Sequence, residues 1–102
     1  MTDIADKRNS MRRRTIFGGV IFRDDGRSAE CSVSDISETG VKVATKEAFE
    51  SGSEVDLKIN KYKNIHRCEV TWIRGNEIGL RFLLPLSKYD EELAGLFKFS
   101  HF

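Results

Sequence analysis

Short stretches in which apolar and polar residues alternate run along most of the chain between residues 15 and 84. In VDLKI (55–59) every second residue is apolar and the residues between them are charged. This period of two is typical of a β-strand with one buried face. Segments rich in strand-forming residues, most of them with this period, cover residues 15–23, 28–36, 41–45, 55–62, 66–74 and 78–84. Turn signals separate them regularly, so the sequence predicts a single all-β domain, either a sandwich or a small barrel.

The period changes near the C-terminal end. Pro85 stops the last predicted strand, and Ser87 is a candidate helix N-cap with acidic residues in the turn that follows it. Apolar residues then recur at helical spacing. The pattern predicts a short amphipathic helix at about residues 87–98 that packs on the β domain, and it leaves the role of the final aromatic tail open.

Charge divides the chain into an arm and a body. The net charge is +1 over 102 residues, but residues 1–14 hold five basic and two acidic residues, which leaves the remainder mildly acidic. Residues 1–11 are polar and aperiodic, so we expect a flexible basic arm there and the folded domain at 12–102. Such an arm suits a phosphate or a nucleic acid, or is simply solvated.

Catalytic and metal-binding chemistry is poorly represented. His66 and His101 have no partners at metal-ligand spacing, and no phosphate-binding loop or nucleophile elbow occurs. Cys31 and Cys68 fall within predicted strands, which favours buried free thiols. We therefore expect a binding protein rather than an enzyme, with no metal and no cofactor. No apolar stretch approaches the roughly 18–20 residues of a membrane span, and a cytoplasmic location is expected.

Two short motifs carry the chemistry that remains, RNSMR at 8–12 and DISETG at 35–40. The planar arginine fork can hold guanine O6 and N7, or a phosphate. A carboxylate accepts from the guanine N1–H and N2–H₂ groups, and a hydroxyl can donate or accept. Gly40 is expected to allow a positive φ and a close ligand approach. Together these groups suit a guanine nucleotide.

With these two motifs in this order, followed by EVTWIRGNEIGLRF (69–82), the chain resembles the PilZ domain family from about residue 7 to residue 84. The resemblance implies a six-stranded antiparallel β-barrel with a helix beside it. It also implies a bacterial receptor for cyclic di-GMP that passes its signal to a downstream partner protein. Stand-alone members act on motility, adhesion, biofilm exopolysaccharide or virulence.

The resemblance also assigns site residues. The family's arginines lie on a flexible N-terminal segment and wrap the guanines and phosphates, whereas its second motif lies on the barrel surface. The ligand-binding positions that match are Arg8, Arg12, Asp35, Ser37 and Gly40, with Lys7 and Arg13 as further candidates. Many members open the first motif with two adjacent arginines, and here the first of them is Lys7, which cannot bridge bidentately.

Two other functions fit parts of the sequence. One is a PilZ-like adaptor that contacts protein without binding a ligand. The other is a small β-barrel that binds RNA or single-stranded DNA, which would need exposed aromatics on successive strands. Trp72 shares a face with Cys68 and Val70 in the alternating pattern, so we expect it in the core, and no DNA or RNA partner is expected. The DISETG segment also fits a turn whose side chains bond only their own backbone, and the role of Arg14 stays open.

Overall fold

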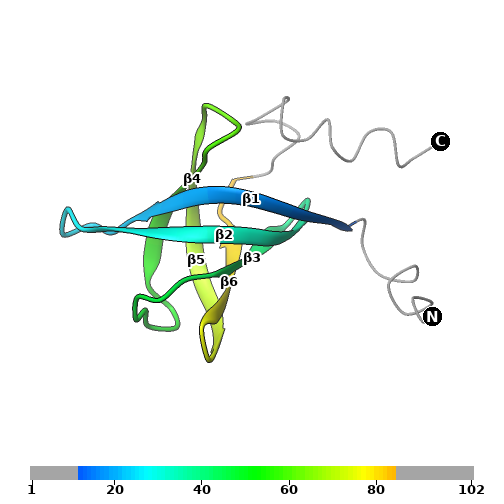
Figure 1. Ribbon diagram of the computed structural model, residues 1–102. Helices are drawn as coiled ribbons and strands as arrows, with labels where there is room; N and C mark the ends of the chain where they lie inside the picture. Colours follow the sequence, from blue (N-terminus) through cyan, green and yellow to red (C-terminus); the bar gives the residue numbers. More distant parts are fainter. Residues whose placement is uncertain (1–11, 85–102) are drawn as a thin grey trace.

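The computed structural model describes residues 12–84 of the chain, with side chains from residue 17 onward. Six β-strands make up this part of the molecule (Figure 1). They are β1 (Arg12–Phe22), β2 (Ser28–Ser37), β3 (Gly40–Ala44), β4 (Glu54–Ile59), β5 (Ile65–Arg74) and β6 (Glu77–Phe82). β1 begins at Arg12 rather than at Thr15, because the residues before Thr15 pair with the end of β2 despite their charge.

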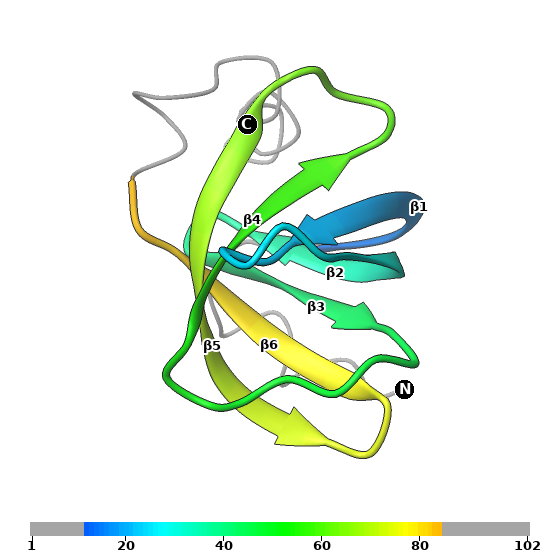
Figure 2. The same cartoon turned by 90° about the vertical axis from the view of Figure 1, so that its left-hand side faces the viewer.

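The strands close into a barrel in the order β1-β2-β3-β6-β5-β4, and β4 pairs back onto β1 (Figure 2). Every neighbouring pair is antiparallel. The six-stranded antiparallel barrel is therefore confirmed. Closure leaves no unpaired sheet edge, so this small domain holds its backbone hydrogen bonds in one continuous ladder.

The barrel interior is filled by the apolar residues of the alternating pattern. Ile21, Val33 and Leu57 come from three different strands and are fully buried. Cys31 and Cys68 are buried free thiols, as expected, and burial raises their pKa to about 11 and about 12 respectively. Such thiols are neutral and pack as small apolar groups.

His66 is a packing histidine rather than a surface one. It is buried, and its ring centroid lies 5.3 Å from that of Phe82. A turn at DDGR (24–27) joins β1 to β2, and Gly26 has a φ of 93° there. The helix predicted at about 87–98 lies outside the described residues. Among the described residues, no helix is long and apolar enough to cross a membrane.

Arg67 of β5 ties together three segments on the outside of the barrel. Its guanidinium donates two hydrogen bonds to the Asp24 carboxylate, at 2.9 and 3.0 Å, and so reaches the β1–β2 turn. It also lies 3.3 Å from Glu54 Oε1 and 3.4 Å from Asp56 Oδ1, both on β4. A bidentate contact of this kind fixes geometry as well as charge, so Arg67 joins the long β1–β2 hairpin to β4 and β5.

We predict that Arg67→Met lowers the melting temperature at neutral pH by a few degrees and that this loss disappears in acid. The hydrogen bond from Arg67 holds the pKa of Asp24 below its ordinary value of 3.8. A depressed carboxyl pKa stabilises the fold above the ordinary value, and the contribution is lost as pH falls through the lower, folded-state value. Thermal melts at neutral pH and below pH 3.8 would measure this.

The matched control for this experiment is Arg27→Met. Arg27 pairs with Asp25 inside the same turn, and the pKa of Asp25 is lowered mainly by the Arg27 backbone N–H, which the substitution keeps. The control should therefore melt close to the parent at both pH values. If Arg67→Met lowered the melting temperature by the same amount at both pH values, the role assigned to the Asp24 carboxylate would be contradicted.

Candidate ligand-binding groove

An open groove with a volume of about 370 Å³ runs over the outer face of the barrel. Its size falls within the roughly 300–1,000 Å³ usual for small-ligand sites. Its lining comes from the second motif and from the strands beside it: Asp35, Ile36, Ser37, Thr39, Gly40, Val41, Lys42, Thr71, Trp72, Gly79, Leu80 and Arg81. The groove thus spans β2, β3, β6 and β5.

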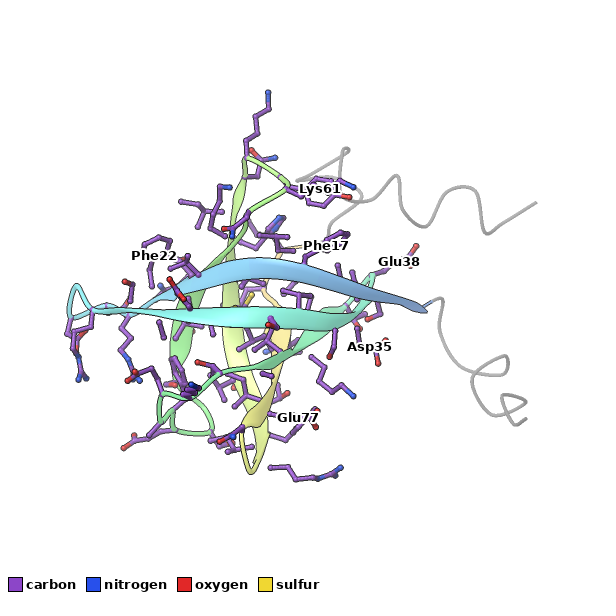
Figure 3. All side chains as sticks on the ribbon, in the orientation of Figure 1. Phe17, Phe22, Asp35, Glu38, Lys61 and Glu77 are labelled. Atoms are coloured by element: carbon purple, nitrogen blue, oxygen red, sulfur yellow. The ribbon has the colours of Figure 1, made fainter. Side chains whose placement is uncertain are left out.

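The strand register aligns one residue from each of five strands across this face. Asp35 lies opposite Arg14 of β1 on one side and opposite Lys42 of β3 on the other. Lys42 lies opposite Gly79 of β6, which in turn lies opposite Trp72 of β5. Figure 3 shows Asp35 at the end of the barrel where β1 begins. The row places a carboxylate, an ammonium group and an indole side by side.

Asp35 points into this row because β2 contains one extra residue. The register of β2 against β3 shifts between Val33 and Asp35, so Ser34 is the bulged residue. Val33 and Ile36 are both buried, and the alternation restarts after the bulge with Asp35 half-buried on the outer side. The Ser34 hydroxyl lies 3.3 Å from the backbone oxygen of Lys42 and donates to it, which fastens the bulge to the neighbouring strand.

A second bulge does the same for Trp72, and it corrects the prediction that this residue lies in the core. The register of β5 against β6 shifts between Val70 and Trp72, with Thr71 as the extra residue. Val70 stays buried, but Trp72 turns outward and 38% of its surface is exposed. The Thr71 hydroxyl donates to the backbone oxygen of Gly79 at 3.2 Å. Each bulge is thus held by one hydroxyl and one carbonyl of the next strand.

The Trp72 indole lies directly on β6 at Gly79. A Cβ added at Gly79 would lie 2.1 Å from the indole Nε1, so glycine is the residue that lets the ring settle there. The Arg74 guanidinium carbon lies 5.5 Å from the indole ring centroid, within cation–π range. The site therefore includes a fixed, partly exposed aromatic ring, which the alternating pattern did not predict.

The DISETG segment forms the β2–β3 turn, as its residue types predict. The Ser37 hydroxyl accepts from the backbone N–H groups of Thr39 and Gly40, each at 3.2 Å, and lies 3.1 Å from Thr39 Oγ1. Ser37 is only 9% exposed. Its hydroxyl therefore closes the turn and holds the backbone at the groove edge in place.

Gly40 corrects a second prediction, because its φ is not positive; positive φ values among the described glycines occur at positions 26, 52 and 75. Glycine is needed here for a different reason. A Cβ at Gly40 would lie 2.2 Å from the backbone oxygen of Leu80 on β6. The turn residue is thus pressed against the neighbouring strand, and this contact brings β2, β3 and β6 together at the groove.

The first motif enters at the same end of the barrel. In the ladder between β1 and β2, Arg12 lies opposite Ser37 and Arg13 lies opposite Ile36. Arg12, the last residue of the first motif, therefore pairs with the DISETG segment, although about twenty residues of chain separate the two motifs. Arg8 and Lys7 lie outside the described residues.

Lys42 and Arg81 are groove residues that the sequence reasoning missed. Lys42 is half-buried in the central row, and Arg81 of β6 lines the wall beside Gly40 and forms an ion pair with Glu69 of β5. Gly79 was a signal for the site, because a glycine inside a strand pattern often marks a place where a ligand or another part of the protein approaches the backbone closely. Lys42 and Arg81 gave no such signal, because surface charges alternate in the same way on any half-buried strand.

A second depression, of about 640 Å³, lies outside both motifs. It is lined by residues 28–32, 44–47 and 76. Neither an arginine nor an aromatic side chain takes part in its lining. Within the part of the chain that the structure describes, no cluster of three or more His, Cys, Asp or Glu side chains could hold a metal ion.

Comparison with known proteins adds one finding. The model of the family described as PilZ domain matches residues 6–99, which is nearly the whole chain and includes both motifs and all six strands. No curated protein matches the chain.

We predict that Gly40→Ala destabilises the protein by roughly 1–3 kcal/mol, as overpacking typically does. The added Cβ meets a backbone oxygen, which cannot move aside without disturbing β6. Denaturant unfolding would measure the change. Gly18→Ala is the matched control, because it also adds a strand methyl group but meets only the flexible end of Asn60, at 3.0 Å. Equal stabilities for the two variants would show that the contact at Gly40 is not tight.

Proposed function

Since the chain belongs to the PilZ domain family, a family of cyclic di-GMP-binding domains that are effectors rather than enzymes, we propose that it is a bacterial receptor for cyclic di-GMP. One observation carries the proposal. The strand register sets Arg12, the last residue of the first motif, opposite Ser37 and sets Arg14 opposite Asp35, at the edge of a groove. The arm that precedes Arg12 can therefore fold back over the groove and enclose a ligand.

The groove offers a group for each part of the dinucleotide. The Asp35 carboxylate accepts from the N1–H and N2–H₂ groups of a guanine. The Trp72 indole provides an aromatic surface for a purine ring. Lys42 supplies a point charge for a phosphate at the centre of the row. These three groups come from β2, β5 and β3, so the rigid barrel presents them before the ligand arrives.

The arm supplies the arginines. Arg8 and Arg12 would grip guanine edges and phosphates through their planar forks, with Lys7 and Arg13 as additional phosphate contacts. Ser37 and Gly40 support the site by a different route, because they fix the turn and its contact with β6. Binding neutralises clustered cations that otherwise repel one another, and this favours the ordered arm only when the anion is present.

The output of such a receptor would be the position of its arm, read by a partner protein. In this account the protein has no catalytic step and no cofactor, acts in the cytoplasm, and regulates a surface behaviour such as motility or biofilm formation. A ligand-independent adaptor would make no use of the groove charges. A nucleic-acid-binding barrel would need a chain of aromatic rings along a basic track, and among the groove-lining residues Trp72 is the single aromatic, with Asp35 in the same row.

Calorimetric titration with cyclic di-GMP tests the function directly. We expect the parent to bind it, and we expect Arg8→Ala and Arg12→Ala each to lose roughly 1–3 kcal/mol of binding free energy, as charge-assisted contacts typically contribute. Arg27→Ala is the control, because Arg27 lies at the β1–β2 turn and pairs with Asp25 there.

The ligands in that titration separate the candidate functions. GTP and a short single-stranded oligonucleotide serve as comparison ligands. Tighter binding of the oligonucleotide would support the nucleic-acid reading, and no binding of any of the three would support the adaptor. If the parent binds cyclic di-GMP and both arginine variants bind it with unchanged affinity, the arm is not part of the binding site.

We also predict that the amides of residues 8–11 gain protection from hydrogen exchange when cyclic di-GMP saturates the protein. The sequence there is polar and has no apolar residues at regular spacing, so ordering must be driven by the ligand. The β4 amides, which lie in the closed ladder, are the internal reference. Protection of residues 8–11 that is already complete without ligand would contradict a signal carried by arm ordering.

A further inference from the structure

The Arg81–Glu69 ion pair lies at the edge of the groove and is not used by either motif. We propose that Arg81 is a further ligand-contacting residue that binds a phosphate of the ligand, and that Glu69 is a competing counter-ion that limits the affinity of the free groove. The inference rests on the proposed function, because it concerns how the same groove holds its ligand. It assigns the two residues opposite effects on binding.

The register places Arg81 between the turn and Glu69. Arg81 of β6 lies opposite Gly40 of β3 on one side and opposite Glu69 of β5 on the other. The three residues form a second row across the barrel, directly beside the row that contains Asp35 and Trp72. Arg81 lines the groove, whereas Glu69 does not. The cation therefore belongs to the groove wall and its carboxylate partner lies outside.

The Arg81 guanidinium can exchange partners. Its side chain is 53% exposed, and Nη2 donates to Glu69 Oε1. A guanidinium carries several donors in one plane and can hold a phosphate oxygen while it turns away from a carboxylate. The ligand's phosphates compete for this group with a single, partly exposed carboxylate.

Glu69 is in turn placed where its charge is unfavourable. It lies opposite Glu54 of β4, and like charges directly opposite one another on a sheet are destabilising. Glu54 accepts a hydrogen bond from Arg67 Nε at 3.3 Å, so the charge of Glu54 is compensated by Arg67. Removal of the Glu69 charge should therefore leave the barrel intact. Exposed ion pairs also contribute little to stability, so neither partner is needed to hold β5 and β6 together.

Arg81 differs from the arm arginines in one useful respect. It is fixed on a strand, so its charge is presented at the groove before any arm residue arrives. A cation at the mouth of a groove accelerates the approach of an anionic ligand, and this effect weakens as salt rises. Arg81 should therefore contribute to the association rate as well as to the final complex.

A double-mutant cycle in the full-length protein tests the assignment, with cyclic di-GMP as the probe and titration calorimetry as the readout. Arg81→Gln should weaken binding roughly fivefold or more. Glu69→Gln should strengthen it by roughly two- to fivefold, because Arg81 is then unopposed. The double variant should match Arg81→Gln alone. A purely structural role for the ion pair would instead make both single variants bind more weakly.

Two further variants sharpen the result. Asp25→Asn is the matched control, because it removes one negative charge from another exposed ion pair, at the β1–β2 turn, and should leave affinity unchanged. Arg81→Lys keeps the charge without the fork, so it should retain the fast, salt-sensitive association while losing part of the affinity. Thermal melts of each variant would establish that the barrel is folded.

The outcomes separate the inference from the function on which it rests. A parent that does not bind cyclic di-GMP overturns both, and the parent titration alone reveals it. A parent that binds, together with an Arg81→Gln variant of equal affinity, overturns the role of Arg81 and leaves the receptor intact. A gain from Glu69→Gln that persists in the Arg81→Gln background would show that Glu69 acts through general charge rather than through Arg81.

Discussion

The groove depends on two strand bulges, each held by a single hydroxyl group. Ser34 in β2 and Thr71 in β5 are the extra residues, and each donates to the backbone oxygen of the residue across from the bulge. Without them the strict alternation would send Asp35 and Trp72 into an interior already filled by apolar side chains. Each bulge turns the side chain that follows it outward. The outer surface of the barrel therefore carries a carboxylate and an indole in the same row.

Barrel closure makes these local features consistent with one another. The β2–β3 turn can press Gly40 against β6 because β3 lies between β2 and β6 in a ladder without edges. The same ladder carries the start of β1 alongside the end of β2, so Arg12, the last residue of the first motif, lies opposite Ser37 of the second. Groups from distant parts of the sequence are thereby held side by side at the groove by backbone hydrogen bonds.

Much of the barrel could be predicted from the sequence, because alternation within a strand is a local property. The inward residues of β4 follow from this alternation, and the turn at DISETG and the buried thiols follow from residue type and position in the same way. The placement of Trp72 could not be predicted, because a bulge is defined by the partner strand rather than by its own residues. The reason for glycine at position 40 could not be predicted either, because the atom that Gly40 approaches belongs to Leu80, far along the chain.

We propose that cyclic di-GMP binds in the groove beside the start of β1, and a two-dimensional amide NMR titration tests this proposal most directly. The account predicts that the largest shifts fall on residues 35–42, on residues 79–81 and on the indole N–H of Trp72. Residues 28–32 line the larger second depression and serve as the internal comparison, because they should hardly move. Shifts concentrated at residues 28–32 and 44–47, with the Trp72 indole unchanged, would contradict the account.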